Sequence, residues 1–485
     1  MGRALPTLPN REGGFAQARA QPVFLTDDKN EWRLRQGRTP MTGDDDFRID
    51  PSWYWTPERA GQEWDSMWTR LWHMGPREEE LPESGDVFVH TLGRESLLFV
   101  RLADGSVRGY FNVCRHRGNR LLLGPDGPAF APKFTCAFHG WEFDLDGSLT
   151  HVPYKERFDP AVIDDPACTS LKTFRVESFA GWLWYTLDEE APPLAEYLGP
   201  IGERLAAYQM EKARIIDYKT FEFGCNWKTT VDAFNESYHF QALHSEVLAW
   251  GNEDAPITLL GIHSYMVNEY GRPSRLYPER ERLNPSLETL LSASGIDPAT
   301  FTGKATDVRA AVAQAKRAKQ GNCVFPYEGL NDSQLTDAYH YQLFATTHFN
   351  LFPEFYVALR YRPHPDGDPE KMYFDFIMCA PLEDGEVAPP YEHRVVRGGQ
   401  EAVEDVLKWG IRQHPVVNQV LGQDVDLVEH VQKGQRSQSF HDAIFSSDER
   451  RITHFHHNID QLIRGRSVRD LIATNPIELD AHPGI

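Results

Sequence analysis

The chain has 485 residues, a length that predicts two domains, and its 41% hydrophobic and 25% charged residues are typical of a globular protein. A formal charge of -21 argues against a nucleic acid or an anionic lipid surface as the partner. No apolar run reaches the roughly 20 residues of a membrane-spanning helix, and the N-terminus has no apolar export segment, so we expect a cytoplasmic protein that does not contact a membrane.

The N-terminal part predicts an arm followed by a helix. Residues 1–45 show little periodicity and predict an extended arm. A helix is expected after Thr56, because Thr56 suits the N-cap and Pro57 the first helical position. Apolar residues at helical spacing then predict one face turned to the core: Trp64, Met67, Trp68, Leu71 and Trp72.

From Gly85 to about Asp188 the hydrophobic period changes to two. Segments such as DVFVHTL, SLLFVRL and GWLWYTL have strand lengths, and the turn signals ADGS and LDGS lie between such segments. The pattern predicts a small all-β domain, so residues 46–190 are expected to hold the first helix and this domain.

Two short motifs in this region each contain one Cys and one His. Cys114 and His116 belong to CRHRGNR, and Cys136 and His139 belong to CAFHGWEF. In a common zinc finger the two Cys form one pair and the two His the other. One Cys and one His in each motif suit a two-iron cluster, with both thiolates on one iron and both imidazoles on the other. A zinc site remains an alternative.

Residues 114–141, including Gly140 and Trp141 after the second His, resemble the Rieske [2Fe-2S] motif. Neither motif has the additional Cys of respiratory Rieske proteins, so the similarity is to the oxygenase and ferredoxin branch. Nearly 300 residues follow this domain, which favours an attached catalytic domain over a simple electron carrier. The remaining cysteines are expected to be free thiols: Cys168, Cys225, Cys323 and Cys379.

The segment NWKTTVDAFNESYHFQALH, residues 226–244, combines an amphipathic helical pattern with the spacing ExxHxxxxH. On a regular helix His239 and His244 lie about 140° apart. We therefore predict a π-bulge or a helix end between Phe240 and Leu243. Glu236 precedes His239 by three residues, so its carboxylate is expected to accept a hydrogen bond from the outer nitrogen of that ring. Asp232 is a further candidate on the buried side.

Over about 400 residues the chain is similar to the α subunits of Rieske non-haem iron oxygenases, also called aromatic ring-hydroxylating oxygenases. The resemblance implies that His239 and His244 bind a mononuclear iron and that Glu236 links it to the cluster of an adjacent subunit. The third ligand would be Asp424 in GQDVDLVE, with Asp426 as the competitor and an acidic helix start as the alternative without metal. The family often has Asp at position 236, and a Glu occurs in carnitine and choline monooxygenases.

The rest of the chain predicts a larger domain, residues 191–485. YHYQLFATTHFNLFPEFYVALRYRP and KMYFDFIMCAPL predict an antiparallel sheet flanked by helices, so the fold class is α+β. Phe349, Leu351 and Phe352 are candidates to face a substrate, with plain core as the alternative. Residues 245–330 predict either a wall over the iron or a surface insertion. His454, His456 and His457 are not expected to bind metal.

The resemblance implies a terminal oxygenase that carries a [2Fe-2S] cluster and Fe(II) and hydroxylates a largely apolar, aromatic substrate with O2. No GxGxxG motif is present, so electrons are expected from a separate NAD(P)H-dependent reductase, with or without a ferredoxin. The implied assembly is a homotrimer (α3) or α3β3. The alternatives are a carnitine/choline-type monooxygenase or O-demethylase, a Rieske electron-transfer protein without oxygenase activity, and a zinc-stabilised structural protein.

Overall fold

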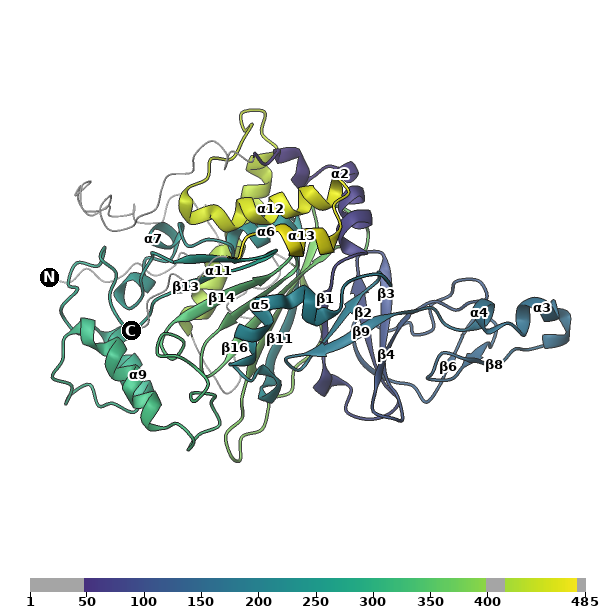
Figure 1. The fold of residues 1–485 in the computed structure, drawn as a ribbon, viewed down its shortest axis with the longest axis horizontal. Coiled ribbons are helices and arrows are strands. Elements are labelled where there is room, and N and C mark those ends of the chain that lie inside the picture. Colours follow the sequence, from purple (N-terminus) through teal and green to yellow (C-terminus); the bar gives the residue numbers. More distant parts are fainter. Residues whose placement is uncertain (1–47, 398–414, 478–485) are drawn as a thin grey trace.

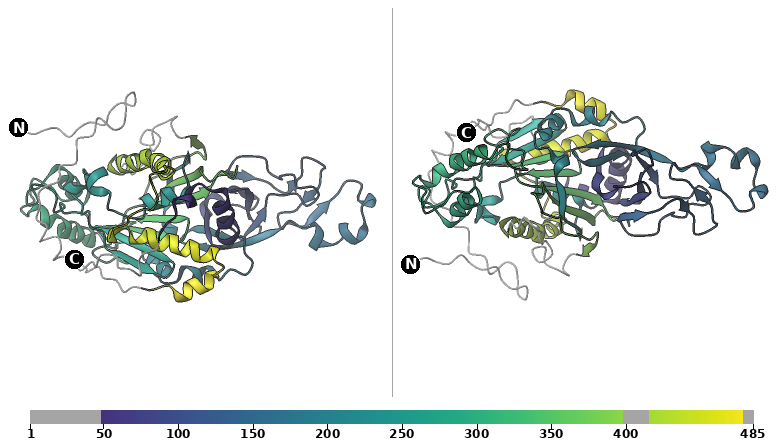
Figure 2. Two further views of the ribbon diagram at one scale, coloured as in Figure 1. Left: turned by 90° about the horizontal axis from the view of Figure 1, so that it is seen from above. Right: turned by 90° about the horizontal axis from the view of Figure 1, so that it is seen from below.

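The computed structural model describes residues 48–397 and 415–477, with side chains of the second range from residue 420. It is an elongated molecule with two large β-sheets and one small sheet (Figures 1 and 2). The small sheet forms one end of the long axis, and α9 (Val308–Ala318) lies toward the other end. The predicted arm, residues 1–45, lies outside the described residues, and the domain boundary at residue 190 stays a prediction.

The first large sheet confirms the predicted all-β region. Its seven strands are ordered β1-β10-β9-β4-β3-β2-β5, and every neighbouring pair is antiparallel. The strands are β1 His73–Arg77, β2 Asp86–Leu92, β3 Glu95–Arg101, β4 Val107–Phe111, β5 Gly127–Phe130, β9 Thr173–Phe179 and β10 Trp182–Thr186. The small sheet beyond it contains β6 Phe134–Thr135, β7 Glu142–Phe143 and β8 Leu149–His151.

The second large sheet has eight strands in the order β12-β13-β14-β15-β16-β17-β11-β18. It is antiparallel as predicted, except that the short edge strand β18 runs parallel to β11. The strands are β11 Arg214–Phe223, β12 Ile257–Leu260, β13 His263–Asn268, β14 Ala338–Leu343, β15 Thr347–Leu351, β16 Tyr356–Pro363, β17 Met372–Ala380 and β18 Val395–Arg397.

Apolar side chains of the two large sheets form one continuous core. The rings of Trp182 and Trp184 on β10 lie 6.4 Å and 6.5 Å from the ring of Phe349 on β15. Phe349 and Leu351 are fully buried in this core. They are therefore plain core residues, the alternative to facing a substrate, and they do not line the cavity beside the candidate ligands. The shared core fixes the first sheet against the second.

A second connection between the sheets is a buried cluster of charges. Asp375 on β17 receives hydrogen bonds from Arg360 (2.6 Å) and Arg362 (2.8 Å) on β16. Arg362 also donates to the Thr91 carbonyl at 2.6 Å and pairs with Asp126, while Arg360 donates to backbone carbonyls of β1. The two guanidinium groups therefore join the eight-stranded sheet to the backbone of the seven-stranded sheet.

Helices cover one face of the eight-stranded sheet. α6 (Trp227–Ala233) lies on β16 and β17 and packs against α11 (Pro415–Gln435), with α12 (Arg450–Ile463) nearby (Figure 1). The remaining helices of four or more residues are α3 Pro160–Ile163, α4 Pro166–Thr169, α5 Leu194–Ala206, α7 Phe240–Leu243, α8 Pro285–Ala293 and α13 Val468–Thr474. None of the helices that the structure describes has the length and apolar character to cross a membrane.

The first helical segment starts as predicted but is less regular. α2 (Pro57–Glu63) follows Thr56 at the N-cap position, yet the Thr56 hydroxyl donates to the Ser52 carbonyl and does not cap the helix. Trp64–Trp68 then forms a π-helical turn, in which Met67 and Trp68 are buried. Glu63 pairs with Lys228 of α6 at 2.7 Å, and both side chains are almost fully buried. This segment therefore supports the helix that leads into the candidate site.

Candidate active site

The segment 226–244 contains two short helices with a break between them. Asn226 caps α6 through a hydrogen bond from the Lys228 amide, and α6 ends at Ala233. An irregular stretch, residues 234–239, precedes the four-residue helix α7. Of the two predicted alternatives, the helix end is the one present: α7 ends at Leu243 and His244 is not helical, and residues 240–243 contain no π-bulge. His239 and His244 sit at the N-cap and the C-cap of α7.

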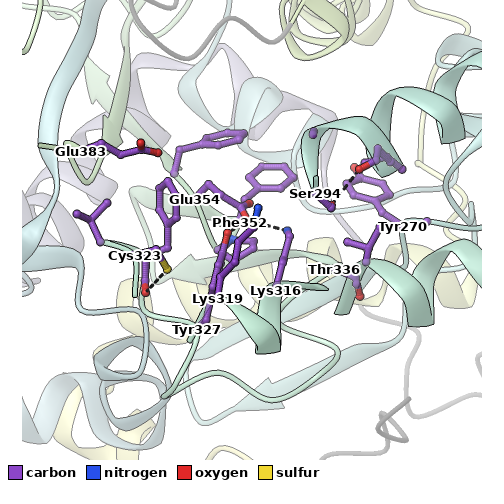
Figure 3. Close-up of a pocket in the computed structure, with 18 of the residues that line it drawn as sticks. Tyr270, Ser294, Lys316, Lys319, Cys323, Tyr327, Thr336, Phe352, Glu354 and Glu383 are labelled. Atoms are coloured by element: carbon purple, nitrogen blue, oxygen red, sulfur yellow. Dashed lines mark hydrogen bonds and ion pairs between the residues drawn. The ribbon is translucent and has the colours of Figure 1, made fainter. Parts of the chain in front are cut away.

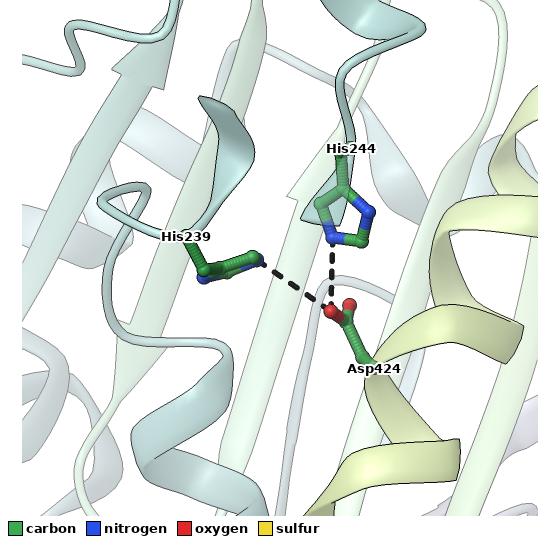
Figure 4. Close-up of side chains that lie close together, drawn as sticks. All are labelled: His239, His244 and Asp424. Carbon is green, nitrogen blue, oxygen red and sulfur yellow. Dashed lines mark hydrogen bonds and ion pairs between the residues drawn. The ribbon is translucent and has the colours of Figure 1, made fainter. Parts of the chain in front are cut away.

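Three of the predicted ligand residues meet at one point (Figure 4). One atom each from His239, His244 and Asp424 lies within 4.8 Å of the others. Nε2 of His244 lies 2.9 Å from Oδ1 of Asp424, and Nε2 of His239 lies 3.5 Å from the same oxygen. Asp424 projects from the middle of α11, so the alternative of an acidic helix start does not apply.

The outer nitrogens of both imidazoles are held by side chains. Nδ1 of His239 donates to Glu236, whose other oxygen accepts the His239 backbone amide at 3.1 Å. Nδ1 of His244 donates to Oε1 of Gln423 at 2.6 Å. When a cation is bound, the protons stay on Nδ1 and both Nε2 lone pairs point toward it and the Asp424 carboxylate; without a cation the neighbouring carboxylates favour a second proton on His239. Acceptor atoms that converge in this way fit a bound cation, and two imidazoles with one carboxylate suit Fe(II).

The charge around His239 agrees with a cation site. Burial lowers the pKa of His239, but the carboxylates of Glu236 and Asp424 outweigh this effect and raise the pKa to about 9. A further carboxylate, Glu449, contributes in the same direction. Burial and the neighbouring charges of Glu236 and Asp232 raise the pKa of Glu449 itself. The pocket wall around Glu236 therefore carries an excess of negative charge.

Asp232 has a different environment from the one that we expected. Its carboxylate accepts a hydrogen bond from the Tyr54 hydroxyl at 2.5 Å and lies 2.9 Å from Nε2 of His456. Tyr54 and His456 are also within hydrogen-bond distance of each other, at 3.1 Å. Asp232 thus joins Tyr54 of the short 3-10 helix Pro51–Tyr54 and His456 of α12 to α6, and these partners are not the ligand candidates.

A small cavity of about 90 Å³ opens beside His239 and Asp424. Apart from Glu236, its other lining residues are mainly apolar: Ala233, Phe234, Phe240, Val247, Trp250, Met266, Tyr270, His340, Asn350, Phe352, Val357, Leu359, Phe376, Val420 and Leu421. Phe352 is the member of the predicted aromatic run that reaches this inner cavity. An apolar lining around a metal site suits an apolar ligand.

A larger outer cavity of about 900 Å³ adjoins the inner cavity (Figure 3). The two cavities share the side chains of Trp250, Tyr270 and Phe352. The rings of Trp250 and Tyr270 are 4.3 Å apart, and Phe352 stacks on Tyr270 at 6.2 Å. α8 and α9 of the segment 245–330 supply part of the outer wall, which favours the wall interpretation over a surface insertion.

The four cluster candidates lie on two loops with matching hydrogen bonds. The Cys114 amide donates to the Asn119 carbonyl and the Cys136 amide to the Trp141 carbonyl, both at 2.8 Å. Gly118 and Gly140 close the two loops with φ of 80° and 70°, a conformation that favours glycine. The matching turns present the four side chains as two equivalent pairs, one Cys and one His from each loop.

The side chains of these loops fit a two-iron cluster. Cys114 and Cys136 are buried, and their thiols interact with each other. Burial raises the pKa of Cys136, but the backbone amides of Phe138 and His139 outweigh it and lower that pKa, which favours a thiolate. The rings of His116 and His139 lie 4.6 Å apart, and the buried Nδ1 of His116 has no hydrogen-bond partner among the described residues. This nitrogen is therefore available to a metal.

Sequence reasoning missed Gln423 and Glu449. Gln423 immediately precedes Asp424 in the sequence, so it could have been noted as a neighbour of the ligand candidate. No sequence pattern, however, marks a Gln as the hydrogen-bond partner of a distant His. Glu449 comes from the start of α12, which only the tertiary structure brings near Glu236.

Comparisons with known proteins identify two domains in the chain. Residues 210–465 match the family described as ring hydroxylating alpha subunit (catalytic domain), and residues 71–175 match the Rieske [2Fe-2S] domain. The biphenyl 2,3-dioxygenase subunit alpha of Rhodococcus jostii (strain RHA1) is 30% identical over 220 residues, covering 42% of this chain and 46% of the relative. The glycine betaine monooxygenase oxygenase subunit of Pseudomonas aeruginosa (strain UCBPP-PA14) is 30% identical over 169 residues, covering 35% and 38%. The chain thus spans less than half the length of these curated relatives.

Solved structures of two kinds share the fold. A quaternary ammonium Rieske monooxygenase in complex with L-carnitine has a TM-score of 0.60 at 19% identity, covering 86% of this chain and 95% of that chain. A naphthalene 1,2-dioxygenase variant bound to phenanthrene has a TM-score of 0.63 at 17% identity, covering 89% and 96%. At these identities the likeness establishes the fold alone.

Proposed function

The chain belongs to the family of ring-hydroxylating oxygenase α subunits, and from this premise we propose that it is a terminal oxygenase that hydroxylates a largely apolar, aromatic substrate with O2. The observation that carries the proposal is the convergence of His239, His244 and Asp424 beside an apolar cavity. Both monooxygenation, which adds one atom of O2 to the substrate, and dioxygenation, which adds both atoms, are consistent with this site.

The roles follow from the geometry of the side chains. Cys114, Cys136, His116 and His139 would hold the [2Fe-2S] cluster, and His239, His244 and Asp424 would hold the mononuclear Fe(II). When bound, the cluster supplies one stored electron, and the mononuclear iron supplies open coordination positions for O2. Glu236 keeps the proton of His239 on Nδ1 and so holds Nε2 toward the metal. Gln423 does the same for His244.

The proposed enzyme receives its electrons from a separate reductase and works as an oligomer. Insertion of oxygen from O2 requires two external electrons, and a sequence without a nucleotide-binding motif needs a separate reductase, with or without a ferredoxin. The cluster loops and α7 lie toward opposite ends of the long axis (Figure 1), so a homotrimer or α3β3 assembly would bring the cluster of one chain to Glu236 of the next. We place the protein in the cytoplasm.

A second candidate function is that of a carnitine- or choline-type monooxygenase, or of an O-demethylase in the same family. Glu236 at the linking position favours it, as does the similarity to a glycine betaine monooxygenase. Six aromatic side chains of the inner cavity are compatible with a quaternary ammonium group: Phe234, Phe240, Trp250, Tyr270, Phe352 and Phe376.

The test is turnover with a surrogate reductase and a panel of arenes, aryl acids and quaternary amines, combined with iron analysis. We expect oxygenated products from arenes and iron in excess of the cluster. Products from quaternary amines alone would favour the second candidate. A protein with cluster iron only would contradict the oxygenase assignment, and a colourless zinc protein would contradict both metal sites.

A further inference from the structure

The inner cavity has one polar position away from the metal candidates. His340 on β14 and Asn350 on β15 both line the cavity, and they face each other directly in the strand register. The residue opposite His340 on the other neighbouring strand is Met266, which is apolar and also lines the cavity. Apart from the metal candidates, Glu236 and Tyr270, the remaining lining is hydrophobic, so this pair offers a neutral polar group of a ligand a partner away from the metal candidates.

His340 is available for such a contact. Its Nε2 atom is buried and has no hydrogen-bond partner among the described residues. A buried nitrogen of this kind destabilises the protein when nothing satisfies it. The Asn350 side chain lies directly across from the ring in the strand register and acts on its pKa. The free nitrogen therefore points to a ligand group that completes the pair.

The imidazole of His340 is neutral near pH 7. Burial is the largest cause and lowers its pKa to about 4; the positive charge of Arg451 acts in the same direction, and the contact with Asn350 only partly opposes them. A neutral imidazole has one donor and one acceptor, and the amide of Asn350 can serve either ring polarity. Nε2 can thus donate to an ether or carbonyl oxygen or accept from a hydroxyl.

Arg451 decides which charge a ligand can carry at this position. Its guanidinium is fully buried on α12, and its two terminal nitrogens have no hydrogen-bond partner among the described residues. Its positive charge acts on His340 and disfavours a cationic group next to that ring. A quaternary ammonium head therefore does not belong at His340.

We propose that His340, held by Asn350, hydrogen-bonds one neutral polar substituent of an otherwise apolar substrate and so orients the substrate next to the metal ligands. This inference rests on the proposed function and narrows its substrate class to apolar molecules that bear a hydroxyl, ether or carbonyl group. His340 lines the same cavity as His239 and Asp424. A substrate held by His340 is therefore placed next to the metal ligands, so His340 helps to determine which substrate reacts.

The test compares the binding affinities of ligand pairs whose members differ only in one polar or charged group. Binding is measured in the iron-loaded protein without reductase. Phenol is compared with benzene, acetophenone with ethylbenzene, and choline with its neutral isostere 3,3-dimethylbutanol. Binding is followed by the change that each ligand causes in the EPR spectrum of the ferrous protein treated with nitric oxide, which reports on the mononuclear site and needs no turnover.

We expect the natural protein to bind each neutral polar ligand about tenfold more tightly than its apolar partner, and choline no more tightly than the isostere. His340→Leu should bring the neutral pairs to a ratio near one. The control Met266→Leu alters the opposite wall without changing its polarity and should keep the tenfold ratio. Asn350→Ala, which leaves the imidazole but removes its partner, should lower the ratio and serves if His340→Leu does not fold.

A ratio that persists in both His340→Leu and Asn350→Ala would overturn the inference, and so would tighter binding of choline than of its isostere. A ratio near one in the natural protein would also overturn it, while a normal nitrosyl spectrum leaves the oxygenase assignment standing. Absence of any nitrosyl signal from a mononuclear iron would instead overturn the proposed function together with the inference.

Discussion

His239, His244 and Asp424 meet although the last two are 180 residues apart in the sequence. The ExxHxxxxH spacing marked the two His as candidates, and the resemblance to Rieske oxygenases implied that they bind iron. Asp424 was harder to choose, since Asp426 lies two residues away on the same segment. Two residues correspond to about 200° on a helix, so only one of the two carboxylates can face the His pair. The structure directs Asp424 toward them.

Asp424→Asn should remove the mononuclear iron and leave the cluster. The carboxylate is the single anionic member of the candidate ligand set, so its loss weakens iron binding while Cys114 and Cys136 are unaffected. Metal analysis and the visible spectrum of the cluster are the measurements. Asp426→Asn is the matched control and should keep both metals. Loss of iron from the control instead of Asp424→Asn would reverse the assignment.

Glu236→Gln should keep both metals and a reducible cluster but lower turnover by about 100-fold, because the amide no longer accepts firmly from Nδ1 of His239 and no longer provides a charged link to the cluster. Steady-state turnover and reductive titration of the cluster separate these effects. Glu236→Asp keeps the carboxylate and is expected to retain part of the activity. Normal turnover of Glu236→Gln would refute the linking role.

The local chain path between the two ligand candidates was only partly predictable. Geometry required an irregularity between His239 and His244, and α7 does end at Leu243, but the longer irregular stretch, residues 234–239, precedes His239 and was not predicted. The location depends on where α6 stops against β16 and β17, which is a tertiary contact. Strand positions were more predictable, because the period-two pattern of buried side chains is encoded within each strand.

Asp375→Asn should destabilise the protein by about 3–5 kcal/mol, because it leaves the buried guanidinium groups of Arg360 and Arg362 without their shared carboxylate. Thermal unfolding at neutral pH measures the loss. Asp164→Asn breaks an exposed pair with Lys155, whose side chains are 59% and 56% exposed, and is the control that should change stability little.

The effect of Asp375 also has a defined pH dependence. Burial raises its pKa, but Arg360 and Arg362 outweigh burial and hold that pKa well below the ordinary value. A carboxyl with a lowered pKa contributes its full stabilisation above the unfolded pKa of about 4 and loses it as the pH falls toward the folded pKa. The stability difference between the natural protein and Asp375→Asn should therefore shrink below about pH 4. A constant difference would argue against an ionised Asp375.

At the scale of the whole molecule, α7 and the small sheet of β6, β7 and β8 lie toward opposite ends of the long axis (Figure 1), so the two candidate metal sites are separated. The sequence predicted the α+β class, and the cluster motifs and the two His could be proposed from local patterns. It did not predict how the two large sheets share one core, because Trp182, Trp184 and Phe349 read as ordinary strand residues until the sheets are packed.

The separation predicts complementation between inactive subunits. Cys136→Ser should lose the cluster, and Asp424→Asn the mononuclear iron, so each alone should be inactive. Co-expressed with different tags and purified through both, the mixed assembly should regain turnover, because a cluster of one chain serves the iron of its neighbour. An inactive mixed assembly, beside an active mixture of two tagged natural chains, would place electron transfer within one chain.

The three rings shared by the two cavities also affect how molecules exchange. Trp250, Tyr270 and Phe352 leave the inner cavity about one tenth the volume of the outer one. A ligand that travels between them must pass these rings, so a departing product and an arriving substrate cannot pass each other there. Release then precedes the next arrival, and a bulky molecule lodged in the outer cavity would slow the enzyme without ever touching the metal.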